Sequence, residues 1–309
     1  WLARYDSPGS GGDQGNDIAV DRAGNVFVTA ISDHGFTTIM YDSAGIEQWV
    51  ASLKNSGSPA AIALDAAGNV LVTGQTGQGI LNFDMATVKY SQTGEELWVA
   101  SYIGPAHDTD LAEAIDTDAQ GNVYVTGRSM GRDTEMDMIT IRYNCFTGAE
   151  EWVERLDRNG NDGGNDLIVD ESAGIIYVTG YSGPIPNYTT IAYSLAGEQQ
   201  WVAFYDYLEC VSDRANAVSL DESGNIYVTG VSAGFGNSFC GDYATIMYNP
   251  FGVQQWAARY SSPGNREDQA NAIAVDEAGS VYITGFISGK NIATIKYEQS
   301  TTEDGTEQD

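Results

Sequence analysis

Apolar runs and polar turns alternate along this chain in a pattern that recurs. Each copy has an apolar strand, a short turn that begins with Asp and contains Gly, and a second apolar strand that ends in Gly or Ala. Four of the six turns have the form Asp-x-x-Gly-Asn. Short apolar runs bounded by Gly, Asn and Asp are typical of paired antiparallel strands. The aligned copies are Asn16–Ala30, Ala60–Gly74, Glu113–Gly127, Asn165–Gly180, Asn216–Gly230 and Asn271–Gly285. A repeat of about 50 residues with several strands per unit indicates a propeller blade.

Each unit continues with a third predicted strand, and five of the six continue with a fourth. The third is a short run that ends in Tyr, and a turn with Gly follows it. The third strands are Thr37–Tyr41, Ala86–Tyr90, Ile139–Tyr143, Thr189–Tyr193, Ala244–Tyr248 and Ala293–Tyr297. The fourth strands open on Trp49, Trp98, Trp152, Trp201 and Trp256. A Trp and a Tyr at the same place in each unit predict packing between blades, because aromatic side chains bury large areas.

The sixth unit has no Trp strand after Tyr297, whereas the chain begins with one. Trp1–Tyr5 matches Trp256–Tyr260. We therefore predict an all-β fold, a six-bladed β-propeller with four-stranded blades and a ring closed by the N-terminal strand, which removes an open sheet edge. Alternatively, the N-terminal strand pairs with a neighbouring molecule and builds a filament. The predicted propeller covers residues 1–297, and residues 298–309 are predicted to be an acidic polar tail or linker.

An up-and-down strand order places the loops at two ends of the sheets. The Asp-x-x-Gly-Asn turns and the Tyr-to-Trp turns are short and uniform, and they share one end, the short-turn end. The loops between second and third strands share the other end with the connections between blades; this is the long-loop end. Its second-to-third loops vary, and they are Gln75–Asp84, Arg128–Met136, Tyr181–Asn187 and Val231–Asp242. Because function usually lies on variable loops carried by a rigid scaffold, we predict that the long-loop end is the working surface.

Charge excludes several classes of function. The 309 residues include 14 basic and 43 acidic side chains, for a formal net charge of −29. Nucleic-acid binders need clustered Lys and Arg to displace counterions from phosphates, so we expect no nucleic-acid partner. Anionic membranes are disfavoured for the same reason. No apolar run reaches the roughly 18 residues of a membrane helix, so we expect no membrane insertion.

Several stretches resemble a known repeat family. Gly12-Asp-Gln-Gly-Asn-Asp-Ile-Ala-Val-Asp21 and the strand that follows it, together with 268–276 and 279–285, resemble the bacterial beta-propeller repeat family called SBBP. The resemblance covers all six units, from Trp1 to Tyr297. It implies a secreted or cell-surface bacterial protein, often one module of a larger chain, with no defined reaction and no catalytic residues. The family name refers to seven blades, whereas six are counted in this sequence.

Acidic residues recur just before the first strand of five units, at Asp13, Asp110, Asp162, Asp213 and Asp268. We expect them at the long-loop end, near the mouth of the central channel. One interpretation is a ring of carboxylates that attracts a cation such as calcium. The other is a structural carboxylate that accepts backbone N–H bonds where the chain begins each blade. Repetition at one register favours the structural interpretation.

The segment Asp157–Gly163 partly resembles a calcium-binding loop. Oxygen ligands stand at alternate positions, Asp157, Asn159 and Asn161. Asp162 replaces the glycine that such loops need at the sixth position, and no Glu stands at the twelfth. Together with Asp110 and Asp213, these four residues are the candidate metal ligands, and calcium is the candidate cofactor.

The sequence also has three cysteines and two histidines, whose side chains are candidates for disulfide formation or catalysis. Cys210 precedes the first strand of the fifth unit and Cys240 lies in its second-to-third loop, which predicts a disulfide if the protein is secreted. Cys145 lies in a turn at the short-turn end and is expected to be unpaired. His34 and His107 belong to separate repeat units. Neither histidine stands within a Gly-x-Ser-x-Gly motif of hydrolases or a His-Glu-x-x-His motif of zinc enzymes.

Loop aromatics of the fourth and fifth units suggest a sugar- or peptide-binding patch. The candidate ligand-binding residues are Tyr181, Asn187, Tyr188, Phe235, Asn237 and Phe239. Ordinary packing of loop aromatics is the alternative.

We therefore predict a secreted or cell-surface propeller that acts as a binding or scaffolding module. Its partner would be a protein, peptide or glycan bound at the long-loop end, and no catalytic residue is assigned. One alternative is a metal-assisted lyase or lactonase, which needs a metal held by non-equivalent side chains at the channel mouth. Another is a self-assembling extracellular filament subunit. A propeller fold is compatible with all three functions.

Overall fold

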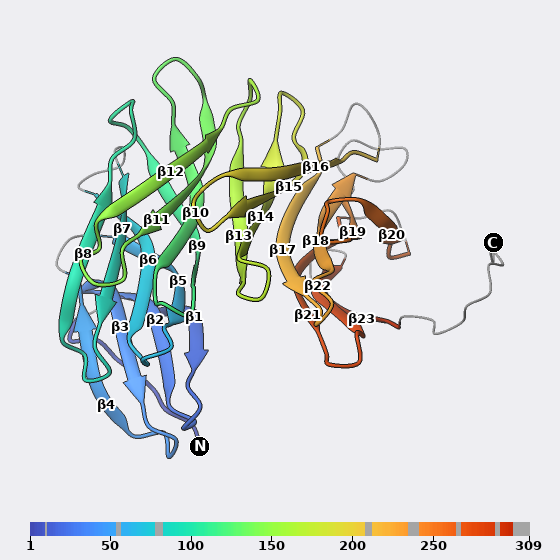
Figure 1. The fold of residues 1–309 in the computed structure, drawn as a ribbon. Coiled ribbons are helices and arrows are strands. Elements are labelled where there is room, and N and C mark those ends of the chain that lie inside the picture. The colour runs from blue at the N-terminus through green and yellow to red at the C-terminus, as the bar shows by residue number, and fades with distance from the viewer. Residues whose placement is uncertain are drawn as a thin grey trace. The chain divides into compact units, whose positions relative to one another are not determined.

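The protein is all-β in a computed structural model that describes residues 1–9, 11–53, 57–77, 83–207, 212–233, 241–263, 267–287 and 291–298. These residues form 23 strands and no helix. Accordingly, the described part of the chain contains no helix long and apolar enough to span a bilayer. The strands make six antiparallel sheets, in each of which sequence neighbours lie side by side (Figure 1).

The chain divides into two compact units, Trp1–Ala215 and Asn216–Asp309, each of which is described by itself. The first unit contains four sheets of four strands. The first sheet has β1 (Gln14–Val20), β2 (Val26–Ser32), β3 (Gly35–Tyr41) and β4 (Glu47–Ser52). The second has β5 (Gly57–Leu64), β6 (Val70–Gly77), β7 (Phe83–Tyr90) and β8 (Glu96–Tyr102). The third has β9 (Asp110–Thr117), β10 (Val123–Met130), β11 (Met136–Tyr143) and β12 (Glu150–Leu156). The fourth has β13 (Gly163–Asp170), β14 (Ile175–Ser182), β15 (Asn187–Ser194) and β16 (Gln199–Tyr205).

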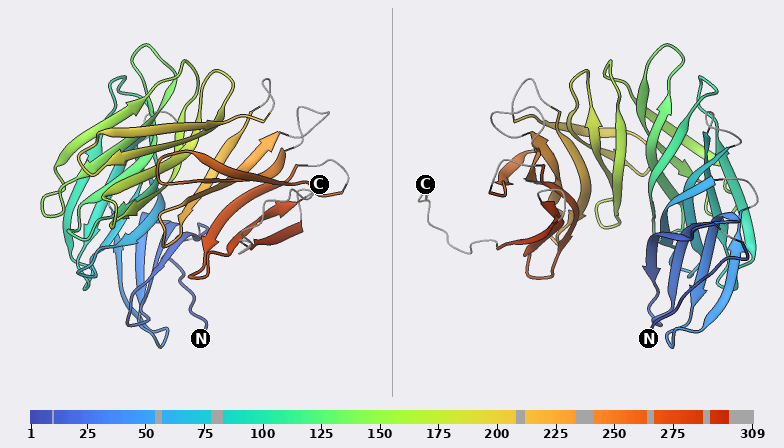
Figure 2. Two further views of the ribbon diagram at one scale, coloured as in Figure 1. Left: turned by 45° about the vertical axis from the view of Figure 1, so that its right-hand side comes forward. Right: turned by 180° about the vertical axis from the view of Figure 1, so that it is seen from behind.

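The second unit contains the remaining two sheets, and the division between the units falls inside β17. The fifth sheet has β17 (Arg214–Leu220), β18 (Ile226–Ala233), β19 (Gly241–Tyr248) and β20 (Gln254–Tyr260). The sixth has only β21 (Gln269–Val275), β22 (Val281–Ile287) and β23 (Asn291–Tyr297). Figure 2 shows the sheets from two further sides, with these last strands in red.

The six predicted repeat units are thus the six sheets, but the predicted N-terminal strand is not one. Trp1–Tyr5 has no strand assignment, and the outer edge of β23 pairs with no strand of the described chain. A segment becomes a strand only when a partner backbone accepts and donates its hydrogen bonds. A six-bladed ring closed by this segment is therefore not confirmed.

The uniform turns follow directly from the Asp-x-x-Gly-Asn sequence. In the second sheet, Asp65 Oδ1 accepts the backbone N–H groups of Ala67 and Asn69, while its Oδ2 accepts the Asn69 side-chain amide at 2.8 Å. Gly68 has a φ of +79°, a left-handed conformation that glycine adopts without a Cβ clash. The same bonds recur around Asp21 and Asp221. The turn therefore supplies its own hydrogen bonds and stays short.

Tryptophans join consecutive sheets of the first unit, as the sequence predicts. Trp49 of β4 lies between Phe27 of its own sheet and Tyr90 of the next, with ring centroids 6.2 and 6.1 Å away. Its indole N–H donates to the Gln92 carbonyl, and a Cβ on Gly94 would come within 2.7 Å of its ring. Trp98 and Trp152 are seated in the same way on Gly148 and Gly197, in the glycine turns of the third and fourth sheets.

Trp1 lies on the first sheet as Trp49 lies on the second. Its ring centroid is 6.2 Å from that of Tyr41, and a Cβ on Gly45 would overlap its ring. The neighbouring surface is nevertheless open, because Ile18 of β1 is 61% exposed. The equivalent Ile62 of β5 is only 7% exposed. Within the first unit, one face of the first sheet is therefore uncovered, whereas the corresponding face of each later sheet packs on its predecessor.

Candidate functional site

The long-loop end of the first unit carries most of the residues singled out by the sequence. Four of the five recurrent carboxylates lie there. Asp13, Asp162 and Asp213 come directly before a first strand, and Asp110 is the first residue of β9. Three of these four are buried, and each accepts a nearby backbone N–H. Asp110 Oδ2 accepts Gly104 N–H at 2.6 Å, and Asp213 Oδ2 accepts Tyr207 N–H at 3.1 Å. Asp13, although exposed, accepts both the backbone N–H and the hydroxyl of Ser7.

Asp268 makes the same contacts in the second unit, where its two oxygens accept the backbone N–H and the hydroxyl of Ser262. Such bonds are those of the structural interpretation, in which the carboxylate fixes the chain before each first strand. Burial raises the pKa of Asp110, although hydrogen bonds from Ser129 and Gly104 oppose this effect. The hypothesis that Asp110 and Asp213 bind a cation stays a prediction.

Asp162 differs from the other recurrent carboxylates, because two more carboxylates lie beside it. Asp137, Asp157 and Asp162 each present an oxygen, and these three oxygens lie within 4.8 Å of one another. Asp137 and Asp162 are buried, whereas Asp157 is exposed. The sequence predicts Asp157 and Asp162 as a pair. It misses Asp137, the second residue of β11, which stands some 20 residues before Asp157.

The other two residues of the predicted calcium loop are not members of this cluster. Asn159 has a left-handed backbone with a φ of +58°, and its N–H donates to Asp157 Oδ1 at 2.8 Å. Asn161 is exposed. Asp162 accepts the backbone N–H groups of Arg158 and Gly183 at 2.7 and 2.6 Å, so it joins its own loop to the β14–β15 loop.

Arg155 compensates part of the negative charge. Its Nη1 lies 2.6 Å from Asp137 Oδ2, and its Nη2 donates to Ser129 Oγ at 2.7 Å and to the Tyr102 hydroxyl. Burial raises the pKa of Asp162, and the negative charges of Asp137 and Asp157 raise it further, against the two backbone hydrogen bonds. Three carboxylates and one guanidinium leave this cluster with an excess of negative charge.

The predicted aromatic patch is only partly within the described residues. Tyr181 and Tyr188 are buried. The Tyr181 hydroxyl accepts a hydrogen bond from Arg128, and Arg214 lies 4.5 Å over its ring. The Tyr188 ring packs on the ring of Tyr205, with centroids 5.6 Å apart. Both tyrosines therefore pack within the protein, and their role in ligand binding stays a prediction. Asn187 is half-buried, and Phe235, Asn237 and Phe239 lie outside the described residues.

The cysteine and histidine predictions have mixed outcomes. Cys210 and Cys240 lie outside the described residues, so their disulfide stays a prediction. Cys145 is a free and buried thiol, as expected. His34 and His107 are both exposed, and His107 has a φ of +53°.

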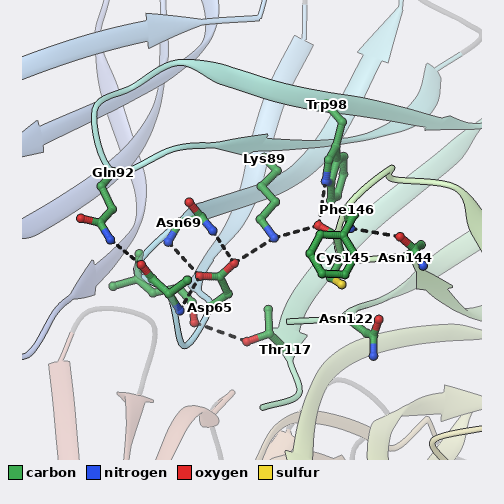
Figure 3. Close-up of polar contacts among 12 residues, drawn as sticks. Asp65, Asn69, Lys89, Gln92, Trp98, Thr117, Asn122, Asn144, Cys145 and Phe146 are labelled. Atoms are coloured by element: carbon green, nitrogen blue, oxygen red, sulfur yellow. Dashed lines mark hydrogen bonds and ion pairs between the residues drawn. The ribbon is translucent and has the colours of Figure 1, made fainter. Parts of the chain in front are cut away.

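A second polar cluster lies at the short-turn end, between the second and third sheets (Figure 3). Lys89 of β7 is buried, and its ammonium lies 2.8 Å from Asp65 Oδ2 and 2.9 Å from the Cys145 carbonyl. The indole N–H of Trp98 donates to the same carbonyl at 3.2 Å. Lys89 thus joins the turn of its own sheet to the third-to-fourth turn of the next.

The repeat pattern does not predict this arrangement. Lys89 stands at the register where the first and fifth sheets have Met40 and Met247, so the pattern indicates only a position inside the sheet packing. Burial by itself would raise the pKa of Asp65. The hydrogen bonds from Lys89 and Asn69 outweigh burial, and the net pKa lies below the ordinary value of 3.8. The positive charge of Lys89 and the negative charge of Asp65 balance each other inside the protein. We therefore assign the cluster a structural role.

Solved structures similar to this chain include several propeller enzymes. Virginiamycin B lyase from Staphylococcus aureus is 11% identical, with a TM-score of 0.59 over 93% of this chain and 85% of the lyase. A protein of unknown function from Bacteroides caccae is 13% identical, with a TM-score of 0.52 over 83% of this chain and 85% of that one. Quinohemoprotein alcohol dehydrogenase from Comamonas testosteroni is 12% identical, with a TM-score of 0.60 over 86% and 55%. At these identities the likeness shows the fold alone.

The sequence comparisons are more local. No curated protein matches the chain. One family model matches, that of the beta-propeller repeat SBBP, over residues 9–37, which include β1, β2 and the beginning of β3. The first sheet of this protein is therefore similar to the SBBP beta-propeller repeat over these residues.

Proposed function

We propose that this protein is a secreted or cell-surface propeller that serves as a binding or scaffolding module, with the long-loop end as its ligand surface. The observation that carries the proposal is the contrast between the two ends. The short-turn end repeats one self-bonded turn, whereas the long-loop end displays loops of different sequence on a rigid base. A rigid frame with variable loops is a common arrangement for recognition.

Buried carboxylates support the rigidity of that base. Asp110, Asp162 and Asp213 fix the segments before three first strands through short bonds to backbone N–H groups. Exposed side chains then project from the loops between these anchors. They include residues 132–135 of the β10–β11 loop and the apolar Ile185 of the β14–β15 loop, which is exposed. A polar rim around an apolar contact suits a protein, peptide or glycan partner.

The test is a binding screen with matched surface variants. The probes are a glycan array and an array of extracellular-protein peptides, read with the purified full chain. In one variant Ile185→Ser is combined with Asp133→Ser and Glu135→Ser. The control variant carries Phe146→Ser at the short-turn end, where Phe146 is exposed. We expect the long-loop variant to lose at least tenfold in affinity for any probe retained by the wild type. Equal binding by the long-loop variant, or loss only in the control, would refute this surface.

We propose the binding role rather than the lyase or lactonase alternative. The similarity to virginiamycin B lyase, at 11% identity, is one of fold and transfers no catalytic residue. Calcium remains the candidate bound ion.

We also propose that the six sheets close into a ring through Trp1–Tyr5, which would become the fourth strand of the sixth sheet. Two observations support this. Trp1 already has on Tyr41 and Gly45 the seat that Trp49 has on Tyr90 and Gly94. In addition, the edge of β23 lacks a fourth strand that every other sheet has.

The register of the fifth sheet gives a direct test. Thr245 of β19 faces Ala258 of β20, and the equivalent pair in the sixth sheet is Thr294 and Ala3. Facing residues of an antiparallel pair are close enough for a disulfide. We expect Ala3→Cys with Thr294→Cys to form an intramolecular disulfide in dilute protein, detected by peptide mapping. Leu2→Cys with Thr294→Cys is one residue out of register and should not form it. A bond formed only between molecules would instead favour the filament.

A further inference from the structure

Three carboxylates from two separate segments meet at the long-loop end. Asp137 is the second residue of β11, while Asp157 and Asp162 lie in the connection from β12 to β13. One oxygen of each lies within 4.8 Å of the others. Oxygens that share a calcium ion at 2.3–2.6 Å are separated by at most about 5 Å, so this spacing fits ligands of one ion.

One buried oxygen of Asp137 has no hydrogen-bond partner among the described residues. Asp137 Oδ2 accepts hydrogen bonds from Arg155 at 2.6 Å and from the Thr134 hydroxyl at 3.0 Å. Asp137 Oδ1 is also buried, yet it accepts no hydrogen bond from any residue that the structure describes. A buried carboxylate oxygen without a donor keeps the unfavourable free energy of leaving water, because no hydrogen bond replaces those it made with water. Oδ1 is therefore an oxygen for which the folded chain provides no donor.

The positive charges around the cluster do not balance it. Arg155 is the cation paired with Asp137. The guanidinium of Arg158, from the same connection, lies instead over the ring of Phe204 at 3.9 Å. Like-charge repulsion acts on Asp162 from both other carboxylates. A bound cation would remove that repulsion.

The fifth sheet provides an internal comparison. Arg259, Asp242 and Ser232 repeat the contacts of Arg155, Asp137 and Ser129, so the Arg–Asp pair belongs to the repeat framework. The residue after β20 is Ser261, at the position that Asp157 holds after β12. What distinguishes the third sheet from the fifth is therefore the third carboxylate, Asp157. It is also the exposed member of the cluster, so it leaves the cluster open to solvent and to an ion.

We propose that Asp137, Asp157 and Asp162 bind one hard divalent cation, Ca²⁺, which fixes the β12–β13 connection to the start of β11. Hard divalent cations prefer carboxylate oxygens, and Ca²⁺ takes six to eight oxygen ligands in a flexible geometry. Water and backbone carbonyls would supply the ligands beyond the three carboxylates. Because Asp162 also accepts the Gly183 N–H, the ion would hold the β14–β15 loop as well. The proposal is independent of the binding function proposed above.

The experiment uses the full chain, stripped with chelator and held in about 0.15 M salt so that diffuse attraction to the acidic surface is screened. Ca²⁺ binding is measured by titration calorimetry, and thermal unfolding is followed with and without Ca²⁺. The site variants are Asp157→Asn and Asp157→Ser, and the second of these copies the residue found after β20. The matched control is Asp108→Asn, which removes an exposed carboxylate from the preceding connection between sheets.

We expect one saturable Ca²⁺ site in the wild type and in Asp108→Asn, with a dissociation constant of about 10⁻³ M or tighter. Both Asp157 variants should bind at least tenfold more weakly, and Ca²⁺ should raise the unfolding temperature of the wild type and the control but not of these variants. Mg²⁺ should bind more weakly, because it needs a stricter octahedral shell. Unsaturable heats that are the same in all four proteins would overturn the proposal, as would unchanged affinity in the Asp157 variants.

Discussion

Replacing Lys89 with Met tests whether the buried ion pair at the short-turn end stabilises the fold. The substitution should fit sterically, because Met40 and Met247 occupy the same register in the first and fifth sheets. It removes the ammonium from Asp65 and from the Cys145 carbonyl, at 2.8 and 2.9 Å. The change is therefore electrostatic rather than a loss of volume.

The expected cost follows from what each partner keeps. Removing one member of a buried pair typically costs about 3–5 kcal/mol, because the remaining charge is uncompensated. Asp65 keeps the side-chain amide of Asn69 and its turn N–H groups, and the Cys145 carbonyl keeps the Trp98 indole. We therefore expect Lys89→Met to lower the free energy of unfolding by about 2–4 kcal/mol at pH 7.

Acidity should reduce this difference. The pKa of Asp65 is lowered in the folded wild type, so its contribution is present above the ordinary value of 3.8 and is lost as the pH falls through the folded pKa. Without Lys89, the ammonium that lowers this pKa is absent, and protonation of Asp65 relieves the buried charge. The stability difference between wild type and variant should therefore shrink as the pH falls from 7 towards 4.

Urea unfolding followed by tryptophan fluorescence measures both effects. The matched control is Lys296→Met, which changes the same residue type at the same register of β23. There the ion pair with Glu298 is exposed, so water screens it and the stability should change little. A cost for Lys89→Met below about 1 kcal/mol at pH 7, or one that does not vary with pH, would refute the electrostatic account.

Two further changes test other contacts. Gly148→Ala should destabilise the protein by about 2–4 kcal/mol, because Gly148 has a φ of +66° and a Cβ there would lie 2.6 Å from the Trp98 ring. Gly174→Ala, with the same φ and nothing within 4 Å, should cost only about 1 kcal/mol, and equal losses in urea unfolding would exclude the Trp98 contact as a cause. Because burial raises the folded pKa of Asp110, stability should fall as the pH rises from the ordinary pKa through the folded one, and Asp110→Asn should flatten that part of the pH profile. An unchanged profile would contradict the burial argument.

The candidate site shows where reading the sequence succeeds and where it fails. Asp157 and Asp162 are close in the sequence, so their pairing follows from local spacing. Asp137 comes from another strand, and the oxygens meet only because the β12–β13 connection folds back over the start of β11. Tyr181 and Tyr188 were candidates because they flank a variable loop, but sequence position does not tell whether a loop aromatic points outward or packs beneath its neighbours.

Apart from the predicted N-terminal strand, the sequence by itself determined the strands, the turns and the six repeat units, because each depends mainly on bonds within a few residues. In the turns of Asp21, Asp65 and Asp221, the aspartate accepts N–H groups two and four residues later, and glycine provides the left-handed backbone. Only the tertiary structure decided which buried polar groups are paired, as in Lys89 with Asp65 and the Cys145 carbonyl. The physical reason is that the packing of two sheets decides which side chain of one sheet meets which group of the other. The local repeat pattern is the same whether or not such a partner is present.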